Sequence, residues 1–277
     1  MADVAFVIIG YNPTLLQTYD VEGNFLRVKS VSGSFNYSNT YLAMDVDRNI
    51  YFCWGSGLAK YNESMIQTLA TASPTVYFCG ICVGADGYVY TLDMLVAGYV
   101  INKRNVSDLS VEETLPVTTS ALVTYSGGLA MDSDGNFYIF RDPRLEKRAS
   151  DGSLTETLIV GAANNENGGI CWIDGYVYIA EATNSLYKIK DDLSSAEMVS
   201  LDYSIAYAMT ATSTKIIFTG WNADNDPVNA MYNTEFNEEW ISAIEIGDYG
   251  YKIGSYGFTV ATVTYDYPIY PVIFPLR

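Results

Sequence analysis

Three carboxylates recur at one position of a repeated pattern and are the first candidates for chemistry. Asp93, Asp142 and Glu181 each follow the second apolar run of their repeat unit, in three consecutive units. Carboxylate oxygens that converge near one point are the ligands that Ca²⁺ prefers. An acidic side chain at such a position also accepts hydrogen bonds from the amides of its own loop. The recurrence favours this structural role, and a Ca²⁺ site is the alternative.

A polar stretch between residues 220 and 227 combines an aromatic ring with amides and carboxylates. Trp221 is followed by Asn222, Asp224 and Asp226. The Asp-x-Asp spacing resembles the start of a Ca²⁺ loop, but the downstream Gly and Glu of that motif are absent. A Trp beside such polar groups also suits the stacking of a sugar. A solvated, turn-rich loop is the simpler interpretation, and glycan binding is the functional one.

Two of the four cysteines form a Cys-x-x-Cys pair, Cys79 and Cys82. A single pair of this kind is a weak indication of redox chemistry or of half a zinc site. Cys82 and Cys171 occupy a slot that holds a small apolar residue in the other repeats, where a free Cys packs well. The sequence therefore predicts that these thiols are structural. The alanines in the same slot are Ala43, Ala130 and Ala208.

The composition excludes several classes of function. The chain has no histidine among its 277 residues, so Ser-His-Asp chemistry, Cys-His chemistry and His-ligated zinc are excluded. Its formal charge of −17 disfavours nucleic acid as a partner. The short apolar run at residues 4–9 lacks a preceding Lys or Arg, so we expect no signal peptide, no membrane insertion and a soluble protein of the cytoplasm or a virion.

The 24 tyrosines exceed the usual share and suggest a contact surface. Many of them fit strands, where aromatic residues are favoured. Tyr125, Tyr249 and Tyr251 instead fall in predicted loops, where an exposed Tyr is a common interface residue. We expect these three to contribute to binding.

Repeats of about 40 residues must position all these side chains. Residues 128–158 show the unit best, because two Asp-Gly turns, Asp134-Gly135 and Asp151-Gly152, separate apolar runs. Asp-Gly between such runs indicates a β-hairpin, and the favoured two-residue turn needs positive φ at both residues. Two hairpins make a four-stranded antiparallel blade, and weakly similar units with irregular spacing favour a β-propeller.

Six copies of two independent markers predict an all-β, six-bladed propeller, with five or seven blades as alternatives. The chain begins with the outer half of a unit and ends with an inner strand. We therefore expect one blade to combine residues 3–29 with a strand near 256–265, which closes the ring within a single domain of residues 1–277. Residues 266–277 hold several prolines and are expected to form an edge strand or a docking arm.

The two faces of such a ring differ in their connections. The first-second and third-fourth turns of each blade are short here, whereas the second-third and blade-to-blade connections are long and varied. Binding residues favour variable loops on a rigid scaffold. The sequence therefore predicts that the functional surface is the face with the long loops.

The segment GLAMDSDGNFYIF, at residues 128–140, resembles the NHL repeat. Residues 42–52, 85–93 and 173–181 resemble it less fully. This similarity implies a propeller, but it does not imply one function, because such propellers serve as scaffolds, glycan binders, lactonases and lyases. Lactonase-like propellers place Glu and Asn metal ligands near the axial mouth, and Glu166, among three asparagines, is the one such cluster in this chain.

The sequence favours a non-enzymatic binding or scaffold module without a cofactor. We expect it to dock another protein or a glycan through its loops, as a structural or attachment component of a larger assembly such as a phage or viral particle, because the chain runs unbroken from Met1 to Arg277. A homo-oligomer stays open. The alternative is a carboxylate- or Ca²⁺-dependent hydrolase that acts on a lactone or a glycan at the axial mouth.

Overall fold

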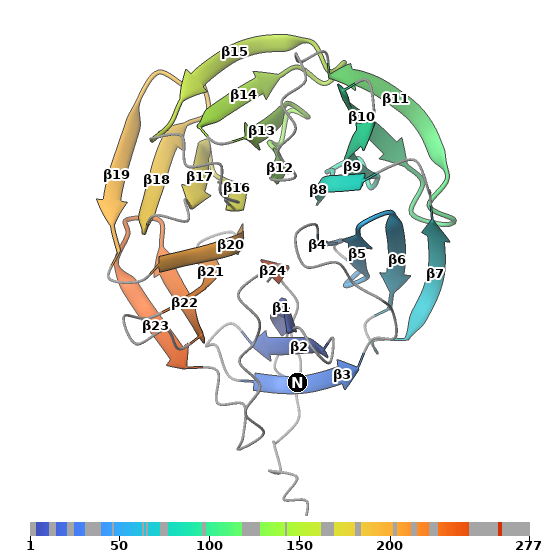
Figure 1. Ribbon diagram of the computed structural model, residues 1–277, viewed down its shortest axis with the longest axis horizontal. Helices are drawn as coiled ribbons and strands as arrows, with labels where there is room; N and C mark the ends of the chain where they lie inside the picture. The colour runs from blue at the N-terminus through green and yellow to red at the C-terminus, as the bar shows by residue number, and fades with distance from the viewer. Residues whose placement is uncertain are drawn as a thin grey trace, which may run out of the picture.

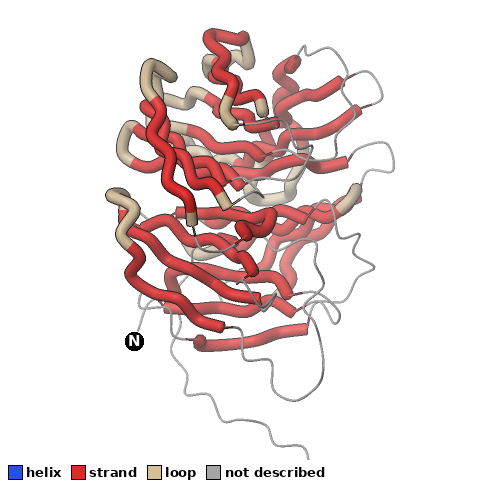
Figure 2. Tube along the Cα trace, turned by 60° about the vertical axis from the view of Figure 1, so that its left-hand side comes forward, coloured by secondary structure: helices blue, strands red, loops and turns tan. Residues whose placement is uncertain are grey.

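The computed structural model describes most of the strands and many of the turns that join them. Its described residues are 4–10, 15–20, 25–30, 40–45, 47–62, 64, 66–72, 77–95, 98–117, 128–141, 143–161, 169–180, 184–201, 204–211, 215–221, 227–243 and 260–261. Figure 2 shows that these residues form strands and turns, with no helix among them. They accordingly include no helix that is long and apolar enough to span a membrane.

The strands form six antiparallel sheets of four strands each, which we call blades 1 to 6 (Figure 1). Blade 1 comprises β24 (Val260–Ala261), β1 (Val4–Gly10), β2 (Leu15–Asp20) and β3 (Phe25–Ser30). Blade 2 comprises β4 (Thr40–Met44), β5 (Ile50–Trp54), β6 (Gly57–Tyr61) and β7 (Gln67–Ala72). Blade 3 comprises β8 (Tyr77–Val83), β9 (Val89–Leu95), β10 (Gly98–Arg104) and β11 (Val111–Val117).

The second half of the chain repeats this plan. Blade 4 comprises β12 (Gly128–Met131), β13 (Phe137–Arg141), β14 (Arg144–Arg148) and β15 (Leu154–Ile159). Blade 5 comprises β16 (Gly169–Ile173), β17 (Tyr176–Ala180), β18 (Ser185–Lys190) and β19 (Ala196–Ser200). Blade 6 comprises β20 (Ser204–Ala211), β21 (Lys215–Trp221), β22 (Pro227–Asn233) and β23 (Glu238–Ala243).

The blades stand around a common axis, with the first strand of each blade innermost (Figure 1). These inner strands contact one another in the order β4, β8, β12, β16, β20, β24 and back to β4. The ring closes in blade 1, where Ile8 of β1 pairs with Val260 of β24 and Val7 pairs with Ala261. A propeller of four-stranded antiparallel blades, with one blade shared by the two ends of the chain, is therefore confirmed.

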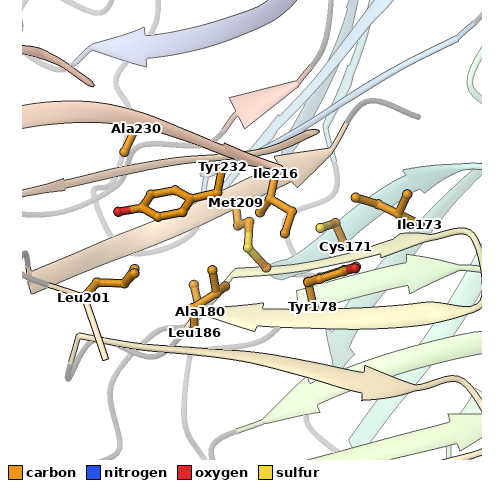
Figure 3. Close-up of a cluster of buried hydrophobic side chains, with 10 residues drawn as sticks. All are labelled: Cys171, Ile173, Tyr178, Ala180, Leu186, Leu201, Met209, Ile216, Ala230 and Tyr232. Atoms are coloured by element: carbon orange, nitrogen blue, oxygen red, sulfur yellow. The ribbon is translucent and has the colours of Figure 1, made fainter. Parts of the chain in front are cut away.

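The hydrophobic core lies between neighbouring blades, which stack face to face. We call each interface a seam. The described seams, from that between blades 2 and 3 to that between blades 5 and 6, are filled by side chains from both blades (Figure 3). In the seam between blades 5 and 6, Cys171 and Tyr178 of blade 5 meet Met209 and Ile216 of blade 6. Because both faces of a middle strand are covered, all of Phe137 to Phe140 is buried, whereas the outer strand β15 is mostly exposed.

The tight turns are mostly not of the predicted type. The sequence predicts two-residue turns with positive φ at both positions, and only Asp174-Gly175 adopts this conformation. At Asp86-Gly87, Asp134-Gly135 and Asp151-Gly152 the glycine alone has positive φ. The amide of Gly135, for example, bonds to the Asp132 carbonyl, and the Asp132 amide bonds to Asn136. This is a three-residue loop with glycine in the left-handed position, the other common hairpin loop.

Candidate functional site: a cleft between blades 3 and 4

In blades 2 and 4, a network of hydrogen bonds to one aspartate fixes the turn between the first and second strands. In blade 4, Asp132 accepts hydrogen bonds from the amides of Asp134 and Asn136, from the Asn136 side chain and from the Tyr138 hydroxyl. In blade 2, Asp45 makes the same set of contacts with Asn49 and Tyr51. The repeated Asp, Asn and Tyr of the sequence pattern are therefore structural, because each satisfies the polar groups of its neighbours.

In blades 2, 4 and 5, a lysine on the third strand donates a hydrogen bond to the next blade. We call this contact the lysine latch. Lys60 donates to the Val106 carbonyl at 3.0 Å, Lys147 to the Asp191 carbonyl at 2.8 Å and Lys188 to the Thr234 carbonyl at 2.9 Å. Each acceptor lies in the third-fourth turn of the following blade. Each lysine pairs across the sheet with a tyrosine of the second strand, namely Tyr51, Tyr138 and Tyr178.

A bulky residue in the same third-fourth turn closes the seam further. Leu109, Leu193 and Phe236 each have positive φ, between 55° and 63°, in the turns of blades 3, 5 and 6. Their side chains pack against the preceding blade, Leu109 beside Tyr51 and Leu193 beside Tyr138. Positive φ is costly for a leucine or a phenylalanine. The recurrence of this strained conformation indicates that filling the seam offsets the cost.

Blade 3 departs from the pattern because Gly84 stands where other blades have Asp45 or Asp132. A Cβ atom at Gly84 would overlap the Asp86 carboxylate and would lie 2.6 Å from the Met131 Cε atom. The missing side chain lets Asp86 fold inward, where it accepts a hydrogen bond from the Tyr90 hydroxyl at 2.7 Å. Asp86 also forms an ion pair with Lys103 at 2.9 Å.

Lys103 is the latch lysine of blade 3, since it pairs across the sheet with Tyr90. Its ammonium group is bound to Asp86 of its own blade. Among the described residues, no lysine of blade 3 donates to the turn of blade 4, where Ser150 holds the position of Val106, Asp191 and Thr234. Gly152 holds the bulky position in the same turn, and β11 packs directly against it: a Cβ atom at Gly152 would lie 3.0 Å from the Leu115 Cβ atom.

A cleft of about 300 Å³ lies beside Lys103 and Ser150, where the latch contact is missing. Its buried lining comes from the apolar Leu115 and Phe137, with Tyr90 and Asp132, and Met131 is partly buried. Phe137 lies edge-on to the Tyr90 ring, with 5.2 Å between the ring centres. Its exposed lining is polar and includes Glu113, Asp134 and Ser150. A cleft with an apolar floor and a few polar groups at its rim is the usual form of a small binding site.

Some carboxylates of the cleft have hydrogen-bond or ion-pair partners, and others do not. Lys103 neutralises Asp86, and Asp132 is saturated by the hydrogen bonds of its own turn. Burial alone would raise the pKa of Asp86, but bonds from Lys103, Tyr90 and the Tyr88 amide lower it below its ordinary value. Among the described residues, the carboxylates of Glu113 and Asp134 have no hydrogen-bond or ion-pair partner. The cleft therefore presents two available negative charges.

The predicted calcium ligand Asp93 lies elsewhere, inside β9 rather than just after it. Its Oδ2 atom accepts bonds from Asn102 at 2.6 Å and from Arg104 at 3.0 Å. Both donors come from the neighbouring strand β10, so the expected hydrogen bonds from loop amides are not the contacts that this carboxylate makes. The error arose because β9 continues two residues beyond Asp93. Arg104 is the positively charged group that Asp93 contacts.

Acid titration is expected to distinguish Asp93 from Asp86. Burial raises the pKa of Asp93 above its ordinary value of 3.8, although bonds from Thr91, Arg104 and Asn102 oppose the shift. Since the folded state binds this proton more tightly than the unfolded state, acidification through the raised pKa adds stability from this group, fully present below about 3.8. The pKa of Asp86 is lowered, so its contribution to stability is present above 3.8 and is lost as the pH falls through the lowered pKa. Carboxyl ¹³C NMR should give midpoints on opposite sides of 3.8, and a common midpoint would contradict both assignments.

A second buried ionic group stabilises blade 4. Glu146, wholly buried in β14, receives ion pairs from Arg141, Arg144 and Arg148. Arg148 is also buried and donates to the Gly152 carbonyl at 2.8 Å, as Arg104 donates to the Leu109 carbonyl in blade 3. These arginines therefore fix the third-fourth turns from inside. No motif in the sequence marked these arginines, although Arg104 and Arg148 are the last residues of the third strands β10 and β14.

Of the other predicted site residues, Trp221 is the one that the structure describes. Trp221 is the last residue of β21, and Pro227 begins β22. The remaining candidates lie outside the described residues, so the metal and loop-face predictions stay untested. These candidates are Asn222, Asp224, Asp226, Tyr125, Tyr249, Tyr251, Asp142, Glu181 and Glu166.

The four thiols have the structural character that the sequence predicts. Cys53, Cys79 and Cys171 are buried, and Cys82 is partly buried. Burial raises the pKa of each thiol, and that of Cys79 reaches about 12. A thiol so far from ionisation is a poor nucleophile and a poor metal ligand. Among the described residues, no group of three or more Cys, Asp or Glu side chains is arranged to hold a metal ion.

Solved structures share the fold at very low sequence identity. A protein of unknown function from Bacteroides caccae has a TM-score of 0.72 and 10% identity, over 95% of this chain and 99% of that one. Virginiamycin B lyase from Staphylococcus aureus, as a catalytically inactive His-to-Ala variant with quinupristin, has a TM-score of 0.58 and 13% identity, over 84% and 78%. A functionally unknown protein from Desulfotomaculum acetoxidans has a TM-score of 0.55 and 11% identity, over 87% and 79%.

The sequence itself has no recognised relatives in these comparisons. No family model matches the chain, and no curated protein matches it significantly. The NHL similarity therefore stays a likeness of pattern, and the structural neighbours support the propeller fold alone.

Proposed function

We propose that this protein is a non-catalytic binding module that holds its ligand in the cleft between blades 3 and 4. The observation that carries the proposal is local. The lysine contact that closes the seams on either side is missing at this seam, because Lys103 pairs with Asp86 of its own blade, and a cleft lies at the same place. This coincidence favours a retained opening over a packing defect. Such a module suits a structural or attachment component of a larger assembly.

The chemistry of the described side chains supports binding rather than turnover. The recurring aspartates hold turns, the buried acids Asp93 and Glu146 face arginines, and the thiols are far from ionisation. The structurally similar lyase is inactive in a variant that lacks one histidine, and this chain contains no histidine at all. Nothing among the described residues favours the hydrolase that the sequence left as an alternative.

A blocked cleft tests this function. Ser150→Trp places an indole over the cleft, and Thr234→Trp places one at the matching position of a seam that Lys188 already closes. Each protein, with ¹³C-labelled methionine methyl groups, is titrated with a panel of blocked amino acids and monosaccharides. We expect at least one class to shift the Met131 methyl signal in the parent and in Thr234→Trp, but not in Ser150→Trp. A panel that never shifts Met131, or shifts it equally in Ser150→Trp, would overturn the proposal.

A further inference from the structure

Blades 3 and 5 carry the same five-residue segment beside their third-strand lysine. Residues 86–90 and residues 174–178 both read Asp-Gly-Tyr-Val-Tyr. The last tyrosine of each segment pairs across the sheet with a lysine, Tyr90 with Lys103 and Tyr178 with Lys188. The two blades therefore present the same residues at the same positions, and a difference between the two lysines must come from their surroundings.

The two lysines lie over equivalent tyrosine rings but bind different oxygen atoms. The Lys188 ammonium is 4.7 Å from the Tyr176 ring centre, and it donates to a carbonyl of the next blade at 2.9 Å. The Lys103 ammonium is 4.0 Å from the Tyr88 ring centre, and it binds the Asp86 carboxylate at 2.9 Å. A place over this tyrosine is therefore compatible with the lysine latch. The ion pair with Asp86 is what holds Lys103 away from it.

The length of the first turn decides where the aspartate of this segment lies. In blade 5, Ile173 pairs with Tyr176, so the turn encloses two residues, and Asp174 has a φ of 46°. In blade 3, the Gly84 amide bonds to the Tyr88 carbonyl, so the turn encloses three residues and Asp86 keeps a negative φ. The longer turn brings the Asp86 carboxylate to Lys103.

The carbonyl that a latched Lys103 would use is retained at Ser150. The Gly152 amide bonds to the carbonyl of the residue before Ser150, as the Leu193 amide bonds to that of the residue before Asp191. Asp191 is the residue whose carbonyl accepts the latch of the preceding blade. Lys103 and Ser150 both line the cleft, so a bond between them would cross it and close it.

The open and the closed position of Lys103 differ little in free energy. In the open position the ion pair is partly in water, with 24% of the Lys103 side chain and 41% of the Asp86 side chain exposed. An ion pair so exposed contributes little to stability. In the closed position the same ammonium makes a charge-assisted hydrogen bond to a carbonyl. The change needs only rotations at the end of one side chain, which are fast.

We infer that Lys103 is a two-position lid of the cleft between blades 3 and 4. Bound to Asp86 it leaves the cleft open, and bound to the Ser150 carbonyl it closes the seam as Lys147 closes the next one. The inference rests on the proposed function and adds its regulation. A compound in the cleft and a latched Lys103 exclude each other, so the closed fraction of the protein lowers the apparent affinity for every occupant.

Removal of the Asp86 carboxylate tests the lid without any ligand. In Asp86→Ala, labelled with ¹³C at lysine and serine, we expect NMR cross-peaks between the ε protons of Lys103 and the α proton of Ser150. The parent should lack them. Asp134→Ala is the matched control, because Asp134 precedes the turn glycine of blade 4 as Asp86 does in blade 3, and it should resemble the parent. Absence of these cross-peaks in folded Asp86→Ala would overturn the lid.

A double variant separates the lid from a direct contact with Asp86. The panel of blocked amino acids and monosaccharides is titrated with the Met131 methyl signal as the readout. A compound that binds the parent should bind Asp86→Ala about tenfold more weakly, because the lid is then mostly closed. Asp86→Ala with Lys103→Met keeps the stem but removes the latching ammonium, so most of the affinity should return. Equal losses in the single and the double variant would contradict the inference.

The outcomes distinguish the lid from the proposed function. If a compound shifts Met131 in the parent but Lys103 does not reach Ser150 in Asp86→Ala, the lid fails and the binding module stands. If Lys103 reaches Ser150 but no compound of the panel shifts Met131, the two positions of the lysine are confirmed and the binding module fails.

Discussion

Replacing Glu146 with alanine is expected to lower the free energy of unfolding by about 3–5 kcal/mol, because it leaves a buried guanidinium without its counter-charge. Arg148 is 1% exposed, and both its Nε and its Nη2 atoms donate to Glu146, at 3.0 and 2.7 Å. Among the described residues, Glu146 is the acid that Arg148 contacts. The loss is measured by urea unfolding followed by tryptophan fluorescence.

Two further variants make the Glu146 result interpretable. Glu156→Ala removes an exposed carboxylate from the adjacent strand β15 and should cost less than about 0.5 kcal/mol. Glu146→Gln keeps polar atoms at the same place but loses the charge. Its loss of unfolding free energy should therefore lie between those of Glu156→Ala and Glu146→Ala. A loss below about 1 kcal/mol for Glu146→Ala would mean that Arg148 finds another partner or water, and that the buried group does not fix the turn.

Alanine at Gly80 is expected to destabilise the ring by about 3 kcal/mol, although alanine is the better residue for most backbone conformations. Gly80 has no positive φ, so alanine would by itself add about 0.4–1 kcal/mol through the unfolded state. Its Cβ atom, however, would lie 2.8 Å from the backbone nitrogen of Leu129 and 3.2 Å from the carbonyl carbon of Gly128. These are backbone atoms of β12, so the inner strands of blades 3 and 4 would have to separate, which is costly in a packed interior.

The sign of the change tests this close approach. Gly87→Ala is the control, since Gly87 has a φ of 80° but an open surrounding, and it should cost about 1 kcal/mol from backbone strain alone. Thermal and urea unfolding of both variants give the comparison. Unchanged or increased stability of Gly80→Ala would show that β8 and β12 do not meet as closely as described. We also expect Gly80→Ala to lose more free energy of unfolding than Gly87→Ala.

The architecture was predictable because each blade needs the same residues at the same positions to form its turns. Asp, Gly, Asn and Tyr recur at fixed offsets since each blade needs the same turn and the same satisfied aspartate, as Asp132 and Tyr138 illustrate. The closure of the ring was also predictable, because the unit at each end of the chain is incomplete. The turn type was not, since Asp-Gly serves both two-residue and three-residue hairpin loops.

The candidate site was not predicted because the residues that mark it lack side chains or contacts that the other repeats have. The sequence pattern drew attention to carboxylates in long loops and placed Asp93 outside its strand, whereas the cleft lies beside the Asp86–Lys103 ion pair on the face with the short turns. A column-by-column comparison of the repeats contains the signal: glycine replaces aspartate at Gly84, and it replaces leucine or phenylalanine at Gly152. What no sequence pattern reveals is that Asp86 would then capture Lys103.

The pairing of β1 with β24 sets the order in which the molecule can be completed during synthesis. Val7 and Ile8 leave the ribosome long before Val260 and Ala261, which cover their free edge. Throughout elongation the nascent chain carries an open strand edge, which is a template for wrong pairing with other chains. Its escape from aggregation therefore depends on how quickly translation reaches Val260 and Ala261 and on what covers the edge of β1 until then.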